Sequence, residues 1–229
     1  MEGEKLVITI GAMIGAGKSS LAKLLGEHLG SEVFYESVEG NPILPLFYTA
    51  TEEEIEKKRY PFLLQLYFLN TRFHSIKQAL IHENNVLDRS IYEDWYFAKV
   101  NKDLGRISDL EFKIYEDLLD NMLEELEELP KKSPDLMIYL SGSFETILRR
   151  IRERGRGYEL DENLVDYYRL LWSGYDEWID TKYTASEVLK IDIDKYDFVH
   201  DMDDQKEVLD MICQKLNKVR KNHKPNNLI

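Results

Sequence analysis

The residues with the clearest chemical signature form the glycine-rich segment GAMIGAGKSS, residues 11–20. Binding a phosphate chain requires backbone N–H groups that point inward, a helix N-terminus, a lysine for the β- and γ-phosphates and a hydroxyl for Mg²⁺. A short apolar run precedes this segment and the helical pattern LAKLLGEHL follows it, which is the context of a Walker A motif. The residues expected at the phosphates of ATP are Gly15, Ala16, Gly17, Lys18, Ser19 and Ser20.

One glycine of this motif is displaced by a single position. In the pattern G-x-x-x-x-G-K-[ST] the first glycine would fall on Ala12, whereas the chain has Gly11 instead. Alanine lacks glycine's freedom at positive φ, so we expect either an αR- or β-like backbone at Ala12 or some strain there. A strand-to-helix turn that contains glycines and binds nothing is the alternative interpretation of the whole segment.

A carboxylate follows the second predicted strand, in the segment FYESVEGNP. Open α/β sheets build their sites at the carboxyl ends of their strands. Glu36 lies at such an end, where it could orient and deprotonate a hydroxyl that attacks the γ-phosphate. We therefore interpret Glu36 as a candidate catalytic base. A solvated loop carboxylate is the alternative, since Glu39 lies nearby.

The third predicted strand runs into the segment DRSIYED. An acidic residue at a strand end beside a phosphate-binding loop commonly contacts Mg²⁺, which prefers oxygen ligands. We expect Asp88 to contact this metal together with the hydroxyl of Ser19. Arg89 presents fixed N–H donors to negative charge, so it could bind the transferred phosphoryl group. An Asp–Arg ion pair that closes a loop is the alternative.

The acidic composition makes a cluster of arginines informative. The chain has 43 acidic and 30 basic residues and a formal charge of −13, which opposes binding to DNA, RNA or an anionic membrane. Nevertheless, five arginines fall within eight positions: Arg149, Arg150, Arg152, Arg154 and Arg156. Because glycines interrupt the helical pattern there, we expect a mobile lid at about 149–160 that closes over phosphates. A solvated helix face is the usual alternative.

The elements that position these residues alternate between short β-branched runs and longer helical patterns. The length of 229 residues suits one α/β domain, and the alternation predicts a parallel sheet covered by helices on both faces. The expected strands are residues 5–10, 32–35, 85–89, 135–140 and 187–191. The expected helices are residues 18–29, 60–81, 92–104, 109–129, 144–154, 162–180 and 203–219.

Two of these helices carry further candidates. Gln65 and Arg72 lie seven positions apart, so they share one helix face about 10 Å apart and could line one pocket. The acidic helix at 109–129 carries apolar residues that could belong either to the core or to a dimer interface. They are Tyr115, Leu118, Leu119, Met122 and Leu126.

The remaining sequence signals concern location and cysteine use. The longest early apolar run, residues 6–14, is too short to span a bilayer and lacks the features of a signal peptide, which favours the cytoplasm. The single cysteine, Cys213, cannot form an intramolecular disulfide. We expect Cys213 to be a buried apolar residue.

Taken together, GAMIGAGKSS, YESV, FLLQLYFLNTRF, DRSIYED and RRIRERGRGYE resemble the deoxyribonucleoside kinase family, most closely its bacterial deoxyadenosine/deoxyguanosine kinases. The resemblance runs from about residue 5 to about residue 215. It implies a P-loop kinase fold with a five-stranded parallel sheet and an arginine-rich lid. It also implies a homodimer that uses ATP and Mg²⁺ to phosphorylate the 5′-hydroxyl of deoxyadenosine or deoxyguanosine in nucleotide salvage.

The resemblance also implies roles for individual residues. The catalytic residues would be Lys18, Glu36 and Arg89. Ser19 and Asp88 would bind Mg²⁺. The deoxynucleoside would be contacted by Glu36, Tyr48, Gln65, Arg72, Arg89, Asp94, Phe97 and Glu159. The lid residues at the ATP phosphates would be Arg150, Arg154 and Arg156, and the adenine-binding loop would contain Asp197 and Phe198.

Within this assignment, the resemblance gives the nucleoside-binding residues distinct tasks. Gln65, Arg72 and Asp94 would read the base, with Asp94 orienting Arg72 through an ion pair. The sugar 3′-hydroxyl would contact Tyr48 and Glu159. The family often has an aromatic residue four positions after the aspartate, where this chain has Ala98, so we expect Phe97 to cover the base instead.

Other interpretations remain open at this point. A nucleoside monophosphate kinase also has a P-loop and an arginine lid, but a carboxylate such as Glu36 would repel its phosphorylated acceptor. A kinase that prefers deoxycytidine is a second alternative. A nucleotide-regulated switch should carry a guanine-reading N-K-x-D motif, and Asn101-Lys102-Asp103-Leu104 does not fit that pattern.

Overall fold

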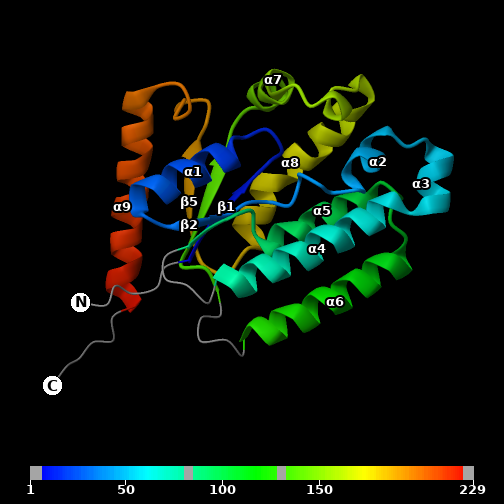
Figure 1. Cartoon of the computed structure of the whole chain (residues 1–229), viewed down its shortest axis with the longest axis horizontal. Helices are drawn as coiled ribbons and strands as arrows, with labels where there is room; N and C mark the ends of the chain where they lie inside the picture. Colours follow the sequence, from blue (N-terminus) through cyan, green and yellow to red (C-terminus); the bar gives the residue numbers. More distant parts are fainter. Residues whose placement is uncertain (1–6, 80–84, 128–132, 224–229) are drawn as a thin grey trace.

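A parallel sheet of five strands, in the order β2-β3-β1-β4-β5, forms the centre of the computed structural model (Figure 1). The structure describes residues 7–79, 85–127 and 133–223. The strands are β1 (Val7–Ala12), β2 (Glu32–Phe34), β3 (Asn85–Asp88), β4 (Leu136–Ser141) and β5 (Glu187–Asp192). This arrangement confirms the predicted sheet, with strand ends that differ from the expected ones by one or two residues.

The strand order places the carboxyl ends of β1 and β3 side by side. Ile10 of β1 lies opposite Asp88 of β3, and Ala12 lies opposite Leu140 of β4. Every residue of β1 and of β3 is buried, as expected for central strands covered on both faces. The ends of β1 and β3 therefore bring the glycine-rich loop next to the DRS segment.

Helices cover both faces of the sheet, with α1 and α9 on one side and α4, α5 and α8 on the other (Figure 1). The α-helices are α1 (Lys18–Leu29), α2 (Leu44–Thr49), α3 (Glu52–Lys58), α4 (Tyr60–Ala79), α5 (Ile91–Asp103), α6 (Asp109–Glu127), α7 (Phe144–Arg154), α8 (Val165–Thr181) and α9 (Met202–His223). Two short 3₁₀ turns, Gly157–Glu159 and Glu162–Leu164, connect α7 to α8. The second of these turns occupies the start of the helix expected at 162–180.

Two short helices between β2 and α4 were not expected from the sequence. The side chain of Asn41 accepts hydrogen bonds from the backbone N–H groups of Ile43 and Leu44 at the start of α2. Thr51 and Glu54 form a reciprocal capping box at the start of α3. Local caps therefore stabilise segments that are too short to show a clear apolar period. The expected strand and helix positions 5–6, 80–81 and 128–129 lie outside the described residues.

The helix α6 packs on α4 and α5, away from the sheet. Tyr115, Leu119 and Leu126 are buried in that contact, so they belong to the core rather than to a dimer interface. The large apolar residues that α6 exposes are Leu110, Ile114 and Leu118. At the start of α6, Glu111 pairs with Arg59 of the loop before α4, which ties the two helices together.

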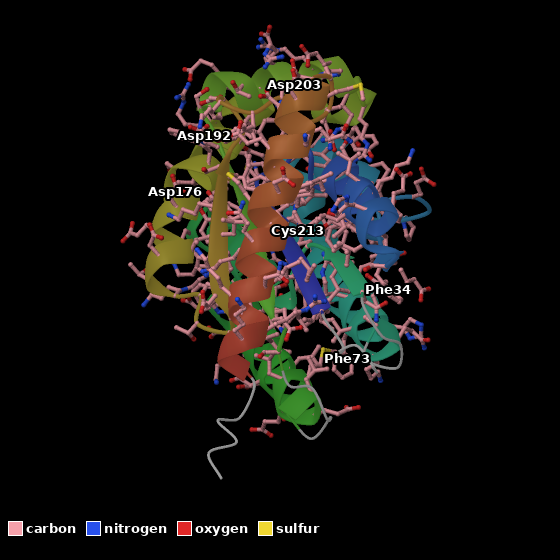
Figure 2. All side chains as sticks on the ribbon, turned by 90° about the vertical axis from the view of Figure 1, so that its left-hand side faces the viewer. Phe34, Phe73, Asp176, Asp192, Asp203 and Cys213 are labelled. Carbon is pink, nitrogen blue, oxygen red and sulfur yellow. The ribbon has the colours of Figure 1, made fainter. Side chains whose placement is uncertain are left out.

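The view from the α9 side places Cys213 midway along α9 and Asp203 near the start of that helix (Figure 2). Cys213 is partly exposed, and its Sγ lies 3.5 Å from Nε2 of His28 in α1. The expectation that Cys213 is buried was therefore wrong, because its neighbour His28, near the end of α1, is itself exposed. Among the described residues, no helix is long and apolar enough to cross a membrane.

Candidate active site

The glycine-rich loop begins directly at the end of β1 and ends at the start of α1. Gly15 and Gly17 have φ values of 85° and 98°, a region that L-residues with a side chain seldom adopt. A Cβ atom on Gly15 would also lie only 2.6 Å from Cγ1 of Ile151. Ala12 belongs to β1, so its backbone is β-like and the motif tolerates alanine without positive φ.

Lys18 is the first residue of α1, and its side chain is almost completely buried against the start of this loop. Its Nζ donates hydrogen bonds to the carbonyl oxygens of Ala12 and Met13, at 3.3 and 3.4 Å. Burial, and then the charge of the nearby Arg89, lower the pKa of Lys18 to about 8. A bound triphosphate would supply the negative charge that this ammonium group needs.

Ser19 and Asp88 lie together, as a shared metal site requires. The Ser19 hydroxyl donates to Oδ2 of Asp88 at 2.6 Å. Oδ1 of Asp88 is buried and has no hydrogen-bond partner among the described residues. These hard oxygen atoms fit Mg²⁺. The described residues contain no group of three or more His, Cys, Asp and Glu that could hold a metal ion by themselves, so phosphate oxygens and water would complete the coordination.

Glu36 follows β2 and is held by two arginines. Its Oε1 accepts from Nη2 of Arg72 at 3.0 Å and from Nε of Arg89 at 2.7 Å. Burial alone would raise the pKa of Glu36, but Arg89 and Arg72 outweigh it and lower this pKa to about 2. Glu36 is therefore ionised at neutral pH, with a carboxylate oriented by two fixed cations.

Arg89 adopts a left-handed backbone conformation with φ of 86°, which is uncommon for a residue with a side chain. Its backbone N–H donates to the carbonyl oxygen of Ile10 at 3.0 Å, and its guanidinium lies 4.4 Å from the ring centroid of Phe97. This strained turn directs the side chain from the end of β3 towards Glu36.

Arg72 and Asp94 form the expected ion pair. Nε and Nη2 of Arg72 donate to the two carboxylate oxygens of Asp94 at 3.0 and 3.3 Å, while Nη1 donates to the carbonyl oxygen of Asp88 at 2.9 Å. All three guanidinium nitrogens of Arg72 thus donate hydrogen bonds, and Nη2 donates to both Asp94 and Glu36.

A cavity opens beside Glu36. Most of the side chains expected to contact a nucleoside line it: Glu36, Tyr48, Gln65, Arg89, Asp94, Phe97 and Glu159. Arg72 is the exception, because it lies behind Glu36 and Asp94 instead of at the cavity wall. The hypothesis that Gln65 and Arg72 line one pocket together is therefore wrong for Arg72.

A second cavity extends along the glycine-rich loop, and the two cavities share part of their lining. The shared residues are Lys18, Glu36, Val38, Arg154 and Arg156. The second cavity is also lined by Gly15, Gly17, Ser19, Ser20 and Arg150. A phosphate chain held by the loop would end where the first cavity begins, next to Glu36.

The arginines of α7 and of the segment directly after it divide into two groups. Arg150 donates to the carbonyl oxygen of Ala16 at 3.0 Å, and Arg154 and Arg156 both pair with the buried carboxylate of Glu159. Arg149, by contrast, forms an exposed pair with Glu153 on the same helix. The arginines expected at phosphates, Arg150, Arg154 and Arg156, are those that line the cavity of the loop.

The loop expected to bind adenine lies beside the glycine-rich loop. Phe198 is buried against Gly17, with its Cζ 3.4 Å from the position of a Cβ on that glycine. Asp197 lies 3.9 Å from Arg150. The cavity along the glycine-rich loop is lined by the next two residues, Val199 and His200. Phe198 thus supports the loop from behind, and its neighbours face the cavity.

Sequence reasoning missed three parts of the site. The helix α2 contributes Leu44 and Phe47 to the nucleoside cavity, and only the Asn41 cap signals this helix in the sequence. Tyr175 of α8 and Glu93 of α5 lie buried beneath the glycine-rich loop. Glu93 follows Ser90 by three positions, so its sequence signal is that of an ordinary helix cap.

A Walker A loop on a parallel sheet, with a second cavity at its phosphate end, defines the class of P-loop phosphotransferases. A family model described as deoxynucleoside kinase matches residues 8–217. The chain belongs to the deoxynucleoside kinase family. It is accordingly an ATP-dependent phosphotransferase.

The relatives of this chain agree with that family. It is 50% identical to a deoxyguanosine kinase of Lactobacillus acidophilus over 218 residues, covering 94% of this chain and 92% of the relative. It is 48% identical to a deoxyadenosine kinase of the same organism over 216 residues, covering 93% and 97%. The structure of the deoxyadenosine kinase of M. mycoides with bound dATP matches with a TM-score of 0.74 and 32% identity, covering 93% of this chain and 100% of that one.

Proposed function

We propose that this enzyme transfers the γ-phosphate of ATP to the 5′-hydroxyl of deoxyadenosine or deoxyguanosine, in nucleotide salvage. The observation that carries this proposal is the wall shared by the two cavities, where Lys18 and Glu36 line both. A phosphate donor in the loop and a nucleoside in the neighbouring cavity would meet at Glu36. In-line phosphoryl transfer requires this juxtaposition of donor and acceptor.

Glu36 would orient the 5′-hydroxyl and accept its proton as the bond to phosphorus forms. In the structure, two arginines hold its pKa at about 2, which makes it a weak base. When negative charge develops on the transferred phosphoryl group, this group attracts the Arg89 guanidinium more strongly than Glu36 does. Movement of the Arg89 guanidinium onto that group would raise the pKa of Glu36 as the proton leaves the hydroxyl.

Mg²⁺ would be held by Ser19 and Asp88 together with the ATP phosphates, whose charge it would partly neutralise. Lys18 would contact the β- and γ-phosphates, and backbone N–H groups of the loop would surround the chain. Arg150, Arg154 and Arg156 would contribute further positive charge from the lid. Closure of that lid would exclude water from the transferred group.

The proposed purine preference rests on two polar side chains that line the nucleoside cavity, Gln65 and Asp94. Gln65 offers an amide donor and acceptor, and Asp94 offers a carboxylate whose position Arg72 fixes. These groups suit a base with an exocyclic amino group, whereas thymine has none and adds a methyl group. Deoxycytidine, which also has an amino group, is the second candidate acceptor. A second structure of the M. mycoides deoxyadenosine kinase, with bound dCTP, is in keeping with this.

A panel of the four deoxynucleosides, with ADP release as the readout, tests this assignment. We expect kcat/KM to rank deoxyadenosine or deoxyguanosine first, deoxycytidine next and thymidine last. The double variant Arg72→Met with Asp94→Leu removes both buried charges together. It should narrow the ratio of purine to thymidine kcat/KM by roughly tenfold, because each lost buried hydrogen bond costs about 1–3 kcal/mol.

A matched control is the pair Arg59 and Glu111, which lies outside both cavities. Changing it to Met and Leu should leave the substrate ratio unchanged. A wild-type enzyme that prefers thymidine would contradict this account of the cavity. An unchanged ratio in the double variant would show that Arg72 and Asp94 do not determine the choice of base.

We also infer a cytoplasmic homodimer. The exposed row Leu110, Ile114 and Leu118 on α6 gives an apolar surface that a second copy of the chain could cover. ATP and free deoxynucleosides are both available in the cytoplasm. Light scattering measures the assembly directly, and a mass near 27.0 kDa, that of one chain, would contradict the dimer.

A further inference from the structure

The carboxylate of Glu93 occupies a buried position beneath the glycine-rich loop and is completely inaccessible to solvent. Its Oε1 accepts from the backbone N–H of Ala12 at 3.0 Å and from the hydroxyl of Tyr175. Its Oε2 accepts from the backbone N–H of Ser90 at 2.8 Å. Nη1 of Arg89 lies 3.4 Å from Oε1. A carboxylate in such a place must be satisfied by several donors.

The displaced glycine of the loop is explained by the same carboxylate. A Cβ atom on Gly11 would lie 3.2 Å from both Cδ and Oε2 of Glu93, and 2.8 Å from Sδ of Met137. A side chain at residue 11 would therefore crowd Glu93 and Met137, while Ala12 remains in regular β1 geometry. The departure from the usual Walker A spacing and the presence of Glu93 are two parts of one arrangement.

The carbonyl oxygen of Ala12 connects this arrangement to the reaction. It accepts hydrogen bonds from Nζ of Lys18 at 3.3 Å and Nη1 of Arg89 at 3.4 Å, and it lies 3.2 Å from the hydroxyl oxygen of Tyr175. Glu93 thus holds the N–H of the residue whose carbonyl contacts both cations of the phosphoryl site. A shift of Ala12 would move Lys18 and Arg89 relative to each other.

We propose that Glu93 is a positioning residue for phosphoryl transfer, which fixes the start of the glycine-rich loop and the guanidinium of Arg89 in one geometry. Tyr175 supports it because its hydroxyl donates to the Glu93 carboxylate while its oxygen lies 3.2 Å from the Ala12 carbonyl oxygen. This inference rests on the proposed function. Glu93 does not line the nucleoside cavity, so it acts on the rate and not on nucleoside binding.

The test compares kcat and nucleoside affinity in Glu93→Gln and Tyr175→Phe. An amide at residue 93 replaces one acceptor oxygen with an N–H donor that faces other donors. We expect kcat to fall about tenfold or more, because a small misplacement of catalytic groups has an effect of that size. Tyr175→Phe leaves the carboxylate in place and should lower kcat less. The Kd for the deoxynucleoside should stay within about twofold in both variants.

The control is Tyr183→Phe, in a buried tyrosine just after α8, the helix that carries Tyr175. This variant removes a hydroxyl that forms a hydrogen bond of 2.7 Å with the hydroxyl of Ser186. Its kcat should match the wild type. Wild-type kcat in Glu93→Gln and Tyr175→Phe, with only a lower Tm, would overturn the proposal. So would an equal fall in kcat in Tyr183→Phe. If Glu93→Gln does not fold, Tyr175→Phe decides alone. An inactive wild type would instead refute the proposed function.

Discussion

Replacing Glu36 with glutamine should lower kcat by about 10²–10⁴-fold, the usual cost of removing a general base. Glutamine keeps the size of the side chain and one oxygen for Arg72 and Arg89, but it cannot accept the proton of the 5′-hydroxyl. The nucleoside would still meet Gln65, Asp94 and the apolar cavity wall. Its Kd should therefore change little while the chemical step slows.

Single-turnover kinetics with saturating ATP and deoxynucleoside measure this effect without product release. Glu39→Gln is the matched control, since Glu39 is an exposed carboxylate in the same loop. It should turn over at the wild-type rate. If Glu36→Gln does so as well, Glu36 is not the base, and the carboxylate serves only to hold Arg72 and Arg89.

The variant Arg89→Lys should lose about 10²–10³-fold in kcat, comparable to the loss of a preorganised donor at developing charge. Lysine retains the positive charge but cannot bridge Glu36, Glu93 and the Ala12 carbonyl, as the guanidinium does. It would also have to keep the left-handed backbone of residue 89. The affinity for ATP should change much less than kcat, because Lys18 and the loop N–H groups remain.

Arg59→Lys provides the control for the backbone effect. Arg59 also has positive φ, 55°, and also pairs with a carboxylate, that of Glu111, yet it lies outside both cavities. Circular dichroism and Tm report folding in both variants. A comparable fall in kcat in Arg59→Lys, or an Arg89→Lys enzyme with wild-type kcat, would contradict the assigned role.

The sequence predicted the regular part of the fold well, because long apolar periods and strong start signals coincide there. The helices α1 and α7 have the expected bounds of 18–29 and 144–154, since a glycine marks the end of each. The short helices α2 and α3 were missed. Their caps, not an apolar stripe, determine them, and a cap alone does not distinguish a helix from a turn.

For the site, residue types at strand ends predicted the groups that gather there, but not how they connect. Spacing along α4 placed Gln65 and Arg72 on one face, yet it could not show that Glu36 and Asp94 lie in front of Arg72. Glu93 illustrates a second limit. A serine followed three residues later by a glutamate predicts a cap, and only the fold brings that glutamate under the N–H of Ala12.

The proposed reaction transfers the γ-phosphate of ATP to the 5′-hydroxyl of a purine deoxynucleoside. The most direct measurement uses ATP labelled at the γ-phosphate with deoxyadenosine or deoxyguanosine, followed by mass spectrometry and phosphorus NMR of the products. We expect ADP and a labelled deoxynucleoside 5′-monophosphate in equal amounts. Transfer only to nucleoside monophosphates, or no transfer to either purine deoxynucleoside, would contradict it.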